Sequence, residues 1–179
     1  MKKPKLVVIC AYPATGKSTI TKYLAKELNY VRLSGDYEMR EEAGEEWFRT
    51  ATEKQKGAAF ARLYEKREKH LGSNENVLID TTGHSEEMRD EHFDTKVECD
   101  KYLVWMKVSP EMSKYIVTKR IAEGTWPADD PDPLESWIEE MGWEDPEPSP
   151  DYELIVYENK QIGDLDKIIE QLREKFGSD

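Results

Sequence analysis

The chain has 179 residues and a formal net charge of −12 at neutral pH, a size that suits one α/β domain with enough chain to bury a core. No run of about 18 apolar residues is present, and the first residues lead directly into a short apolar segment, so we expect no membrane-spanning helix, no signal peptide and a cytoplasmic location. The two cysteines, Cys10 and Cys99, argue against a disulfide framework and a zinc spacing.

Predicted strands and helices alternate along the chain. Strands are predicted at residues 6–10, 30–33, 76–80, 101–108 and 152–157. Helices are predicted at residues 18–28, 37–70 with a break near Gly44, 86–93, 110–122, 134–141 and 164–176. Strands separated by helices are typical of a parallel sheet with right-handed crossovers, which binds ligands at the carboxyl ends of its strands. The sequence therefore predicts a three-layer α/β fold with a mostly parallel five-stranded sheet.

The segment LVVICAYPATGKST, residues 6–19, has the order strand, loop, helix that a phosphate-binding loop requires. Backbone N–H groups of such a loop and the positive end of the following helix face the same anion. Gly16 lets the backbone approach the phosphates, Lys17 reaches the β and γ phosphates, and the Ser18 hydroxyl is placed to ligate Mg²⁺. The alternative is a glycine loop that matches by accident. The predicted ATP site consists of Pro13, Ala14, Thr15, Gly16, Lys17, Ser18 and Thr19.

The loop departs from the pattern Gly-x-x-x-x-Gly-Lys-Ser/Thr at its first position, where Ala11 replaces glycine. Alanine is the smallest residue with a Cβ atom, so the loop can still close if this position keeps a negative φ.

An acidic residue follows the second predicted strand in LSGDYEMR. Asp36 comes just after the strand and Arg40 one helical turn later, so both side chains are expected on the same side. A carboxylate there can accept the proton of a substrate hydroxyl that attacks a γ-phosphoryl group, and Arg40 can hold an anionic part of the acceptor. Asp36 is thus the candidate catalytic base. The alternative is an ordinary helix N-cap with a surface ion pair.

Asp80 ends the strand segment VLIDTT. An acid at this point is expected to order Mg²⁺, or a basic side chain near the phosphates, and to contribute to the substrate site. Because Thr81 rather than a second acid follows, no carboxylate is available there to activate water, and transfer to an alcohol is favoured over ATP hydrolysis. The alternative is a simple cap on the strand end.

Two cations, Lys119 and Arg120, end the helix predicted at residues 110–122, next to Gly124. Residues 119–151 are interpreted as a lid within a single domain that covers residues 1–179. When such a lid closes, a cation can neutralise charge on the transferring phosphoryl group, and Arg120 is the better candidate because its guanidinium has a fork of donors. The alternative is that both cations only compensate the helix dipole.

These motifs together resemble a known family. The succession LVVICAYPATGKST, LSGDYEMR, VLIDTT and Thr-Lys-Arg-x-x-x-Gly-Thr, within residues 5–125, resembles the P-loop kinases that include the polynucleotide 5′-hydroxyl kinases. The resemblance implies a P-loop NTPase/kinase fold with a helical lid, and ATP and Mg²⁺ as cofactors. It assigns roles in ATP, metal and substrate binding and in catalysis to Lys17, Ser18, Asp36, Arg40, Asp80 and Arg120. Arg40 lies one residue later than in the family, and Glu123 stands where the family has a second lid arginine.

The predicted function is that of an ATP-dependent kinase that phosphorylates a hydroxyl, with a polynucleotide 5′-hydroxyl, a nucleoside or a nucleotide as acceptor. Eleven acids and no lysine or arginine lie between residues 128 and 153, leaving the remainder nearly neutral, and such a segment would repel a phosphate backbone unless it faces away. The same segment contains Trp126, Trp137 and Trp143. They either pack a small subdomain or hold a sugar or a cationic amine in a small-molecule kinase. A further alternative is a nucleotide-sensing module without phosphotransfer.

Overall fold

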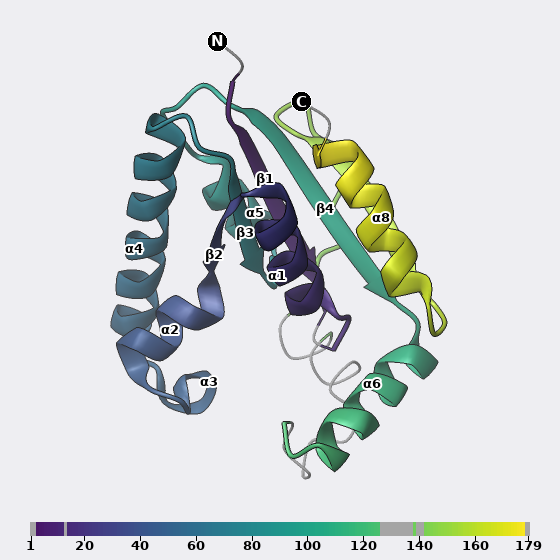
Figure 1. Cartoon of the computed structure of the whole chain (residues 1–179). Coiled ribbons are helices and arrows are strands. Elements are labelled where there is room, and N and C mark those ends of the chain that lie inside the picture. Colours follow the sequence, from purple (N-terminus) through teal and green to yellow (C-terminus); the bar gives the residue numbers. More distant parts are fainter. Residues whose placement is uncertain (1–2, 13, 126–137, 139–141, 178–179) are drawn as a thin grey trace.

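The computed structural model describes residues 3–12, 14–125, 138 and 142–177. Its five strands form one parallel sheet in the order β2-β3-β1-β4-β5, with helices on both faces (Figure 1). The three-layer α/β fold with a five-stranded sheet that the sequence predicts is confirmed. Among the described residues, no helix combines the length and the apolar character that crossing a bilayer requires.

The strands agree with the predicted ones to within two residues at each end. They are β1 (Lys5–Ala11), β2 (Val31–Ser34), β3 (Val77–Thr81), β4 (Asp100–Val108) and β5 (Glu153–Asn159). The central strand β1 is buried along its whole length, as expected for a parallel strand that is covered on both faces.

The helices follow the predicted order with one correction. They are α1 (Lys17–Leu28), α2 (Gly35–Ala43), α3 (Trp47–Thr50), α4 (Glu53–Gly72), α5 (Glu86–Phe93), α6 (Pro110–Ala122) and α8 (Asp164–Gly177). The chain breaks not only at Gly44 but again before Thr52, which starts α4 with a reciprocal capping box to Gln55. The helix predicted at residues 134–141 lies outside the described residues, apart from Ile138.

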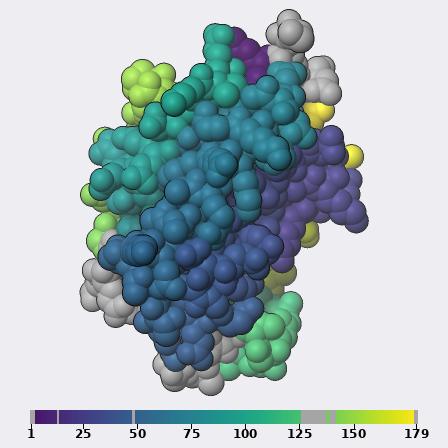
Figure 2. Space-filling view, turned by 90° about the vertical axis from the view of Figure 1, so that its left-hand side faces the viewer, coloured from purple at the N-terminus to yellow at the C-terminus, as the bar shows by residue number. Residues whose placement is uncertain are grey.

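Two hydrophobic cores lie on opposite faces of the sheet. On one face α1 and α8 pack against residues such as Ile9 of β1. On the other face α4 and α5 pack against residues such as Val8, and Figure 2 shows α4 with α2 and α3 covering this side of the molecule. Cys10 belongs to the second core, and burial raises the pKa of its thiol to about 12, so that it stays protonated at neutral pH.

His92 is fully buried, which the polar sequence around it does not suggest. Its ring lies beside Phe60 and Tyr64 of α4, with centroids 6.1 and 5.7 Å apart, and its Nε2 is 3.1 Å from Thr81 Oγ1. Burial, helped by the positive charge of Arg67, lowers the pKa of His92 to about 3. The ring is therefore neutral in the folded protein.

We expect the folded state to lose stability as the pH falls below about 6.5, because the unfolded chain then binds a proton that native His92 excludes down to about pH 3. One excluded proton corresponds to about 2 kcal/mol between pH 7 and pH 5. Urea unfolding at the two pH values measures this difference. His92→Gln should abolish most of this pH-dependent difference in stability, whereas His70→Gln should retain it. An unchanged difference in His92→Gln would contradict the attribution of the pH dependence to His92.

Candidate active site

The loop between β1 and α1 lies at the carboxyl edge of the sheet, at the same end of the molecule as α2, α3 and α6 (Figure 1). Two of its residues have a left-handed backbone, Ala14 with φ +57° and Gly16 with φ +91°. Ala11 lies in β1 opposite Met106 and is not among the described residues with positive φ, so alanine at this position meets the condition for the loop to close. Gly16 is the N-cap of α1, and the first N–H groups of that helix point toward the position an anion would take.

Residues from the end of the chain brace this loop. Asn159, the last residue of β5, is buried and donates from Nδ2 to the Thr15 carbonyl oxygen at 3.1 Å. Leu165 of α8 packs so closely on Gly16 that a Cβ atom there would meet Leu165 Cδ1 at 2.8 Å. The loop therefore depends on the contact between the β5–α8 connection and the start of α1.

Asp80 is the centre of a cluster of polar side chains below the loop. Its carboxylate is 2% exposed; Lys17 Nζ binds Oδ1, and Arg32 binds Oδ2 through one terminal nitrogen. Thr21 Oγ1 donates to Oδ2 at 2.8 Å and accepts a hydrogen bond of 3.0 Å from Arg32 Nε. Burial acts to raise the pKa of Asp80, but the charges and hydrogen bonds of Lys17 and Arg32 outweigh it and hold the pKa below its ordinary value.

Thr21 and Arg32 were not found by sequence reasoning, although a signal for each was present. Arg32 is a charge inside the four-residue strand β2, and Thr21 is a buried polar residue one turn after Lys17 on α1. Because β2 pairs with β3, Arg32 lies near enough to reach Asp80. The sequence motifs identified Lys17 and Asp80, whereas the pairing of β2 with β3 places Arg32 and the packing of α1 places Thr21.

Asp36 lies in the first turn of α2 and is exposed. The N-cap of this helix is Ser34, whose Oγ accepts from the Tyr37 N–H at 3.5 Å, so the alternative that Asp36 is an ordinary N-cap is wrong. The ion pair between Asp36 and Arg40 is not formed either, because Arg40 Nε binds Glu45 at 2.8 Å. Among the described side chains, none forms a hydrogen bond or an ion pair with the Asp36 carboxylate, which leaves it open to a ligand.

The remaining predicted site residues that the structure describes lie in the first turn of α1 and in the last turn of α6. Ser18 and Thr19 are exposed in the first turn of α1, and Pro13 lies outside the described residues. Arg120 lies in the last turn of α6, where it donates to the Thr125 carbonyl at 3.4 Å. The neighbouring Lys119 is 3.9 Å from Glu123. A lid at residues 119–151 stays a prediction, since residues 126–137 and 139–141 lie outside the described part.

The described end of the acidic segment contacts the start of the phosphate loop. The Trp143 ring lies on Tyr12 with centroids 4.1 Å apart, and Tyr12 OH donates to Asp145 at 3.3 Å. The Glu144 carboxylate accepts from the Glu86 N–H at 2.7 Å at the start of α5. Carboxylates therefore lie beside the loop, while Trp126 and Trp137 fall outside the described residues.

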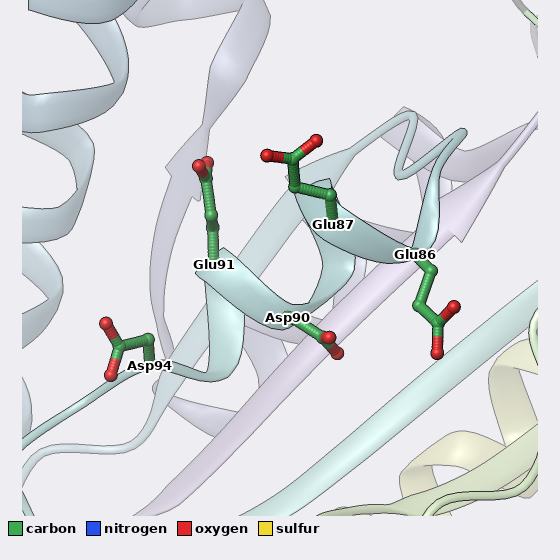
Figure 3. Close-up of a pocket in the computed structure, with 5 residues that line it drawn as sticks. All are labelled: Glu86, Glu87, Asp90, Glu91 and Asp94. Atoms are coloured by element: carbon green, nitrogen blue, oxygen red, sulfur yellow. The ribbon is translucent and has the colours of Figure 1, made fainter.

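A hollow on α5 is lined by acids alone (Figure 3). Its lining consists of Glu86, Glu87, Asp90, Glu91 and Asp94. Glu86 and Asp90 point to one side of the helix, whereas Glu87 and Glu91 point to the other. Five carboxylates would repel a polyphosphate, so this hollow does not compete with the β1–α1 loop as the nucleotide site.

A family model described as AAA domain matches residues 6–137, which include the loop, Asp36, Asp80 and α6. No curated protein matches the sequence.

Solved kinase structures share the fold. A putative kinase from Chloroflexus aurantiacus j-10-fl superimposes with a TM-score of 0.68 at 22% identity, covering 99% of this chain and 98% of that chain. A sugar kinase from Janibacter sp. HTCC2649 gives 0.67 at 22% identity, with coverages of 96% and 91%. A chain of the Pnkp1/Rnl/Hen1 RNA repair complex gives 0.62 at 19% identity, with coverages of 79% and 45%. Identities this low show the fold alone, which is an α/β P-loop kinase-like fold.

We expect Gly16→Ala to destabilise the protein by about 1–2 kcal/mol, because it adds a Cβ atom at positive φ and against Leu165. Urea unfolding measures the loss. Gly124→Ala is the matched control, since Gly124 also has positive φ (+67°) but no heavy atom within 4 Å of the added Cβ, and it should cost less. In a Leu165→Ala background, the two glycine substitutions should lower the free energy of unfolding by similar amounts. Equal losses of stability in the unmodified chain would contradict the packing contact between Gly16 and Leu165.

Proposed function

Because the chain belongs to the AAA domain family, whose model covers residues 6–137, we propose that it is an ATP-dependent kinase that transfers the γ-phosphoryl group to a hydroxyl. The observation that carries this proposal is the pairing of Lys17 with the buried Asp80 at the carboxyl edge of the parallel sheet. A lysine held beside a glycine loop and a helix N-terminus is the arrangement that binds the phosphates of a nucleotide.

Asp36 is the proposed general base. It is exposed in the first turn of α2, and its carboxylate has no hydrogen-bond or ion-pair partner among the described side chains. It would take the proton of the acceptor hydroxyl while the hydroxyl oxygen forms a bond to the γ-phosphorus and the bond to ADP breaks. Lys17 and Arg120 would stabilise the negative charge of the transferring group. Arg40 would bind an anionic part of the acceptor once it leaves Glu45.

Mg²⁺ fits the residues present. Magnesium prefers oxygen ligands and usually binds through one or two protein groups together with phosphates and water. Ser18 offers an exposed hydroxyl in the first turn of α1, and Asp80 offers a carboxylate beside Lys17. Ser18 would hold the ion directly, and Asp80, whose two oxygens are bound by Lys17, Arg32 and Thr21, would contribute once Lys17 turns to the phosphates. The ion would neutralise phosphate charge.

The acceptor is proposed in two forms. A polynucleotide 5′-hydroxyl follows from the sequence motifs, and a chain of an RNA repair complex shares the fold. A sugar or a cationic amine is supported by a specific contact, because Asp145 and Trp143 lie against Tyr12 in the phosphate loop. Carboxylates at this point oppose a phosphate backbone and suit a neutral or cationic acceptor.

We expect Asp36→Asn to lower phosphoryl transfer by at least about 100-fold, because the base is lost, and to leave ATP affinity within about twofold. Transfer of label from γ-labelled ATP to a 5′-hydroxyl oligonucleotide, and in parallel to a panel of sugars and amino alcohols, measures turnover and identifies the acceptor. Glu41→Gln, an exposed acid on the same helix, is the matched control. Equal loss of turnover and ATP affinity in Asp36→Asn would overturn the assignment as base, and ATP binding without transfer to any hydroxyl would indicate a nucleotide sensor.

We expect Lys17→Ala to weaken ATP binding and turnover together, since the lysine contacts phosphate in both the ground and the transition state. Equilibrium binding of a fluorescent ATP analogue measures the first effect. Lys26→Ala, an exposed lysine in the last turn of α1, should bind as the unmodified chain does. Full activity in Lys17→Ala would rule out the phosphate-loop assignment.

A further inference from the structure

This inference rests on the proposed function, in which Lys17 must bind two partners, the Asp80 carboxylate and the phosphates of a nucleotide. The Lys17 side chain is 11% exposed, and its ammonium group binds the Asp80 carboxylate. Contact with nucleotide phosphates requires the same group to leave Asp80 or to share it. Asp80 is 2% exposed, and a buried carboxylate that loses its partner is strongly disfavoured. Without a second cation, the buried acid would therefore compete with the nucleotide for Lys17.

Arg32 supplies that second cation from a different strand. It binds Asp80 Oδ2, whereas Lys17 binds Oδ1, so the two cations use different oxygen atoms of one carboxylate. Its Nε also donates to Thr21 Oγ1 at 3.0 Å, and Thr21 in turn donates to Oδ2 at 2.8 Å. The guanidinium thus holds one carboxylate oxygen both directly and through the threonine hydroxyl. A lysine ammonium lacks the planar fork that spans two such partners.

We propose that Arg32 is a positioning residue that keeps Asp80 paired while Lys17 turns to the phosphates of a nucleoside diphosphate or triphosphate. Arg32 acts on the nucleotide only through Asp80 and Lys17. Its removal should weaken phosphate binding because Asp80 then retains Lys17, and not because a contact to the nucleotide is lost. This dependence on Asp80 separates the proposal from a purely structural role, in which Arg32 would matter for folding alone.

The test is a double-variant cycle read out by ADP binding in the absence of Mg²⁺, so that metal binding by Asp80 plays no part. Isothermal titration calorimetry on the full chain gives the Kd. Arg32→Met should raise the Kd for ADP roughly tenfold or more, and Arg32→Lys should give an intermediate value because the charge is kept without the fork. In an Asp80→Asn background, Arg32→Met should change the Kd by less than about twofold, because no carboxylate competes for Lys17.

Each other outcome overturns the inference in a recognisable way. An unchanged Kd in Arg32→Met would show that Lys17 does not need the second cation. The same loss in both backgrounds would show that Arg32 acts on the nucleotide or the fold directly. Thermal unfolding of each variant shows whether Arg32→Met has a folding defect. If it has, the Kd of Arg32→Lys is compared with that of the unmodified chain instead. Failure of the unmodified chain to bind ADP would overturn the proposed function itself, whereas normal binding and phosphoryl transfer with an unaffected Arg32→Met would overturn this inference alone.

Discussion

Burying the charge of Asp80 is the constraint on which the candidate site depends. The carboxylate lies at the end of β3 inside the sheet, where water cannot solvate it, so protein groups must pair with it. Those groups come from two other elements: Lys17 and Thr21 from α1, and Arg32 from β2. One buried acid thereby sets the position of the phosphate-loop lysine and joins the first helix to the edge strand.

The same end of the molecule is also braced by residues from the other edge of the sheet, where β5 lies. Asn159 and Leu165, at the end of β5 and the start of α8, contact Thr15 and Gly16. The loop therefore lies between two sets of contacts, one below it at Asp80 and one beside it at the β5–α8 connection. A left-handed backbone at Ala14, which is unfavourable for alanine, is tolerated because these contacts fix the residues that follow it.

Charge is distributed unevenly around this site. Beneath the loop, the two cations Lys17 and Arg32 pair with the single carboxylate of Asp80, which leaves one positive charge in excess. The described part of the acidic segment, in contrast, places Glu144 and Asp145 beside α5 and Tyr12. In the proposed function, a polyphosphate would bind where the N–H groups of α1 and Lys17 lie, and these carboxylates lie beside the start of the same loop. An acceptor that binds next to Tyr12 would face the carboxylates of the acidic segment. The charge of the acceptor is therefore the property that this segment would select.

The sequence by itself determined the order of strands and helices, the phosphate loop, and the positions of Asp36 just after β2 and of Asp80 near the end of β3, because apolar periodicity and local motifs act over neighbouring residues. It also predicted the parallel sheet, since helical crossovers permit few topologies. Only the tertiary structure decided that Ser34 rather than Asp36 caps α2, that Arg40 binds Glu45, and that Arg32 and Thr21 complete the Asp80 cluster. The contacts of Arg32 and Thr21 depend on which elements lie side by side, and that of Arg40 on which exposed charges meet, neither of which is encoded in the spacing of residues along the chain. The Ser34 cap is a local contact that depends on the residue at which α2 starts.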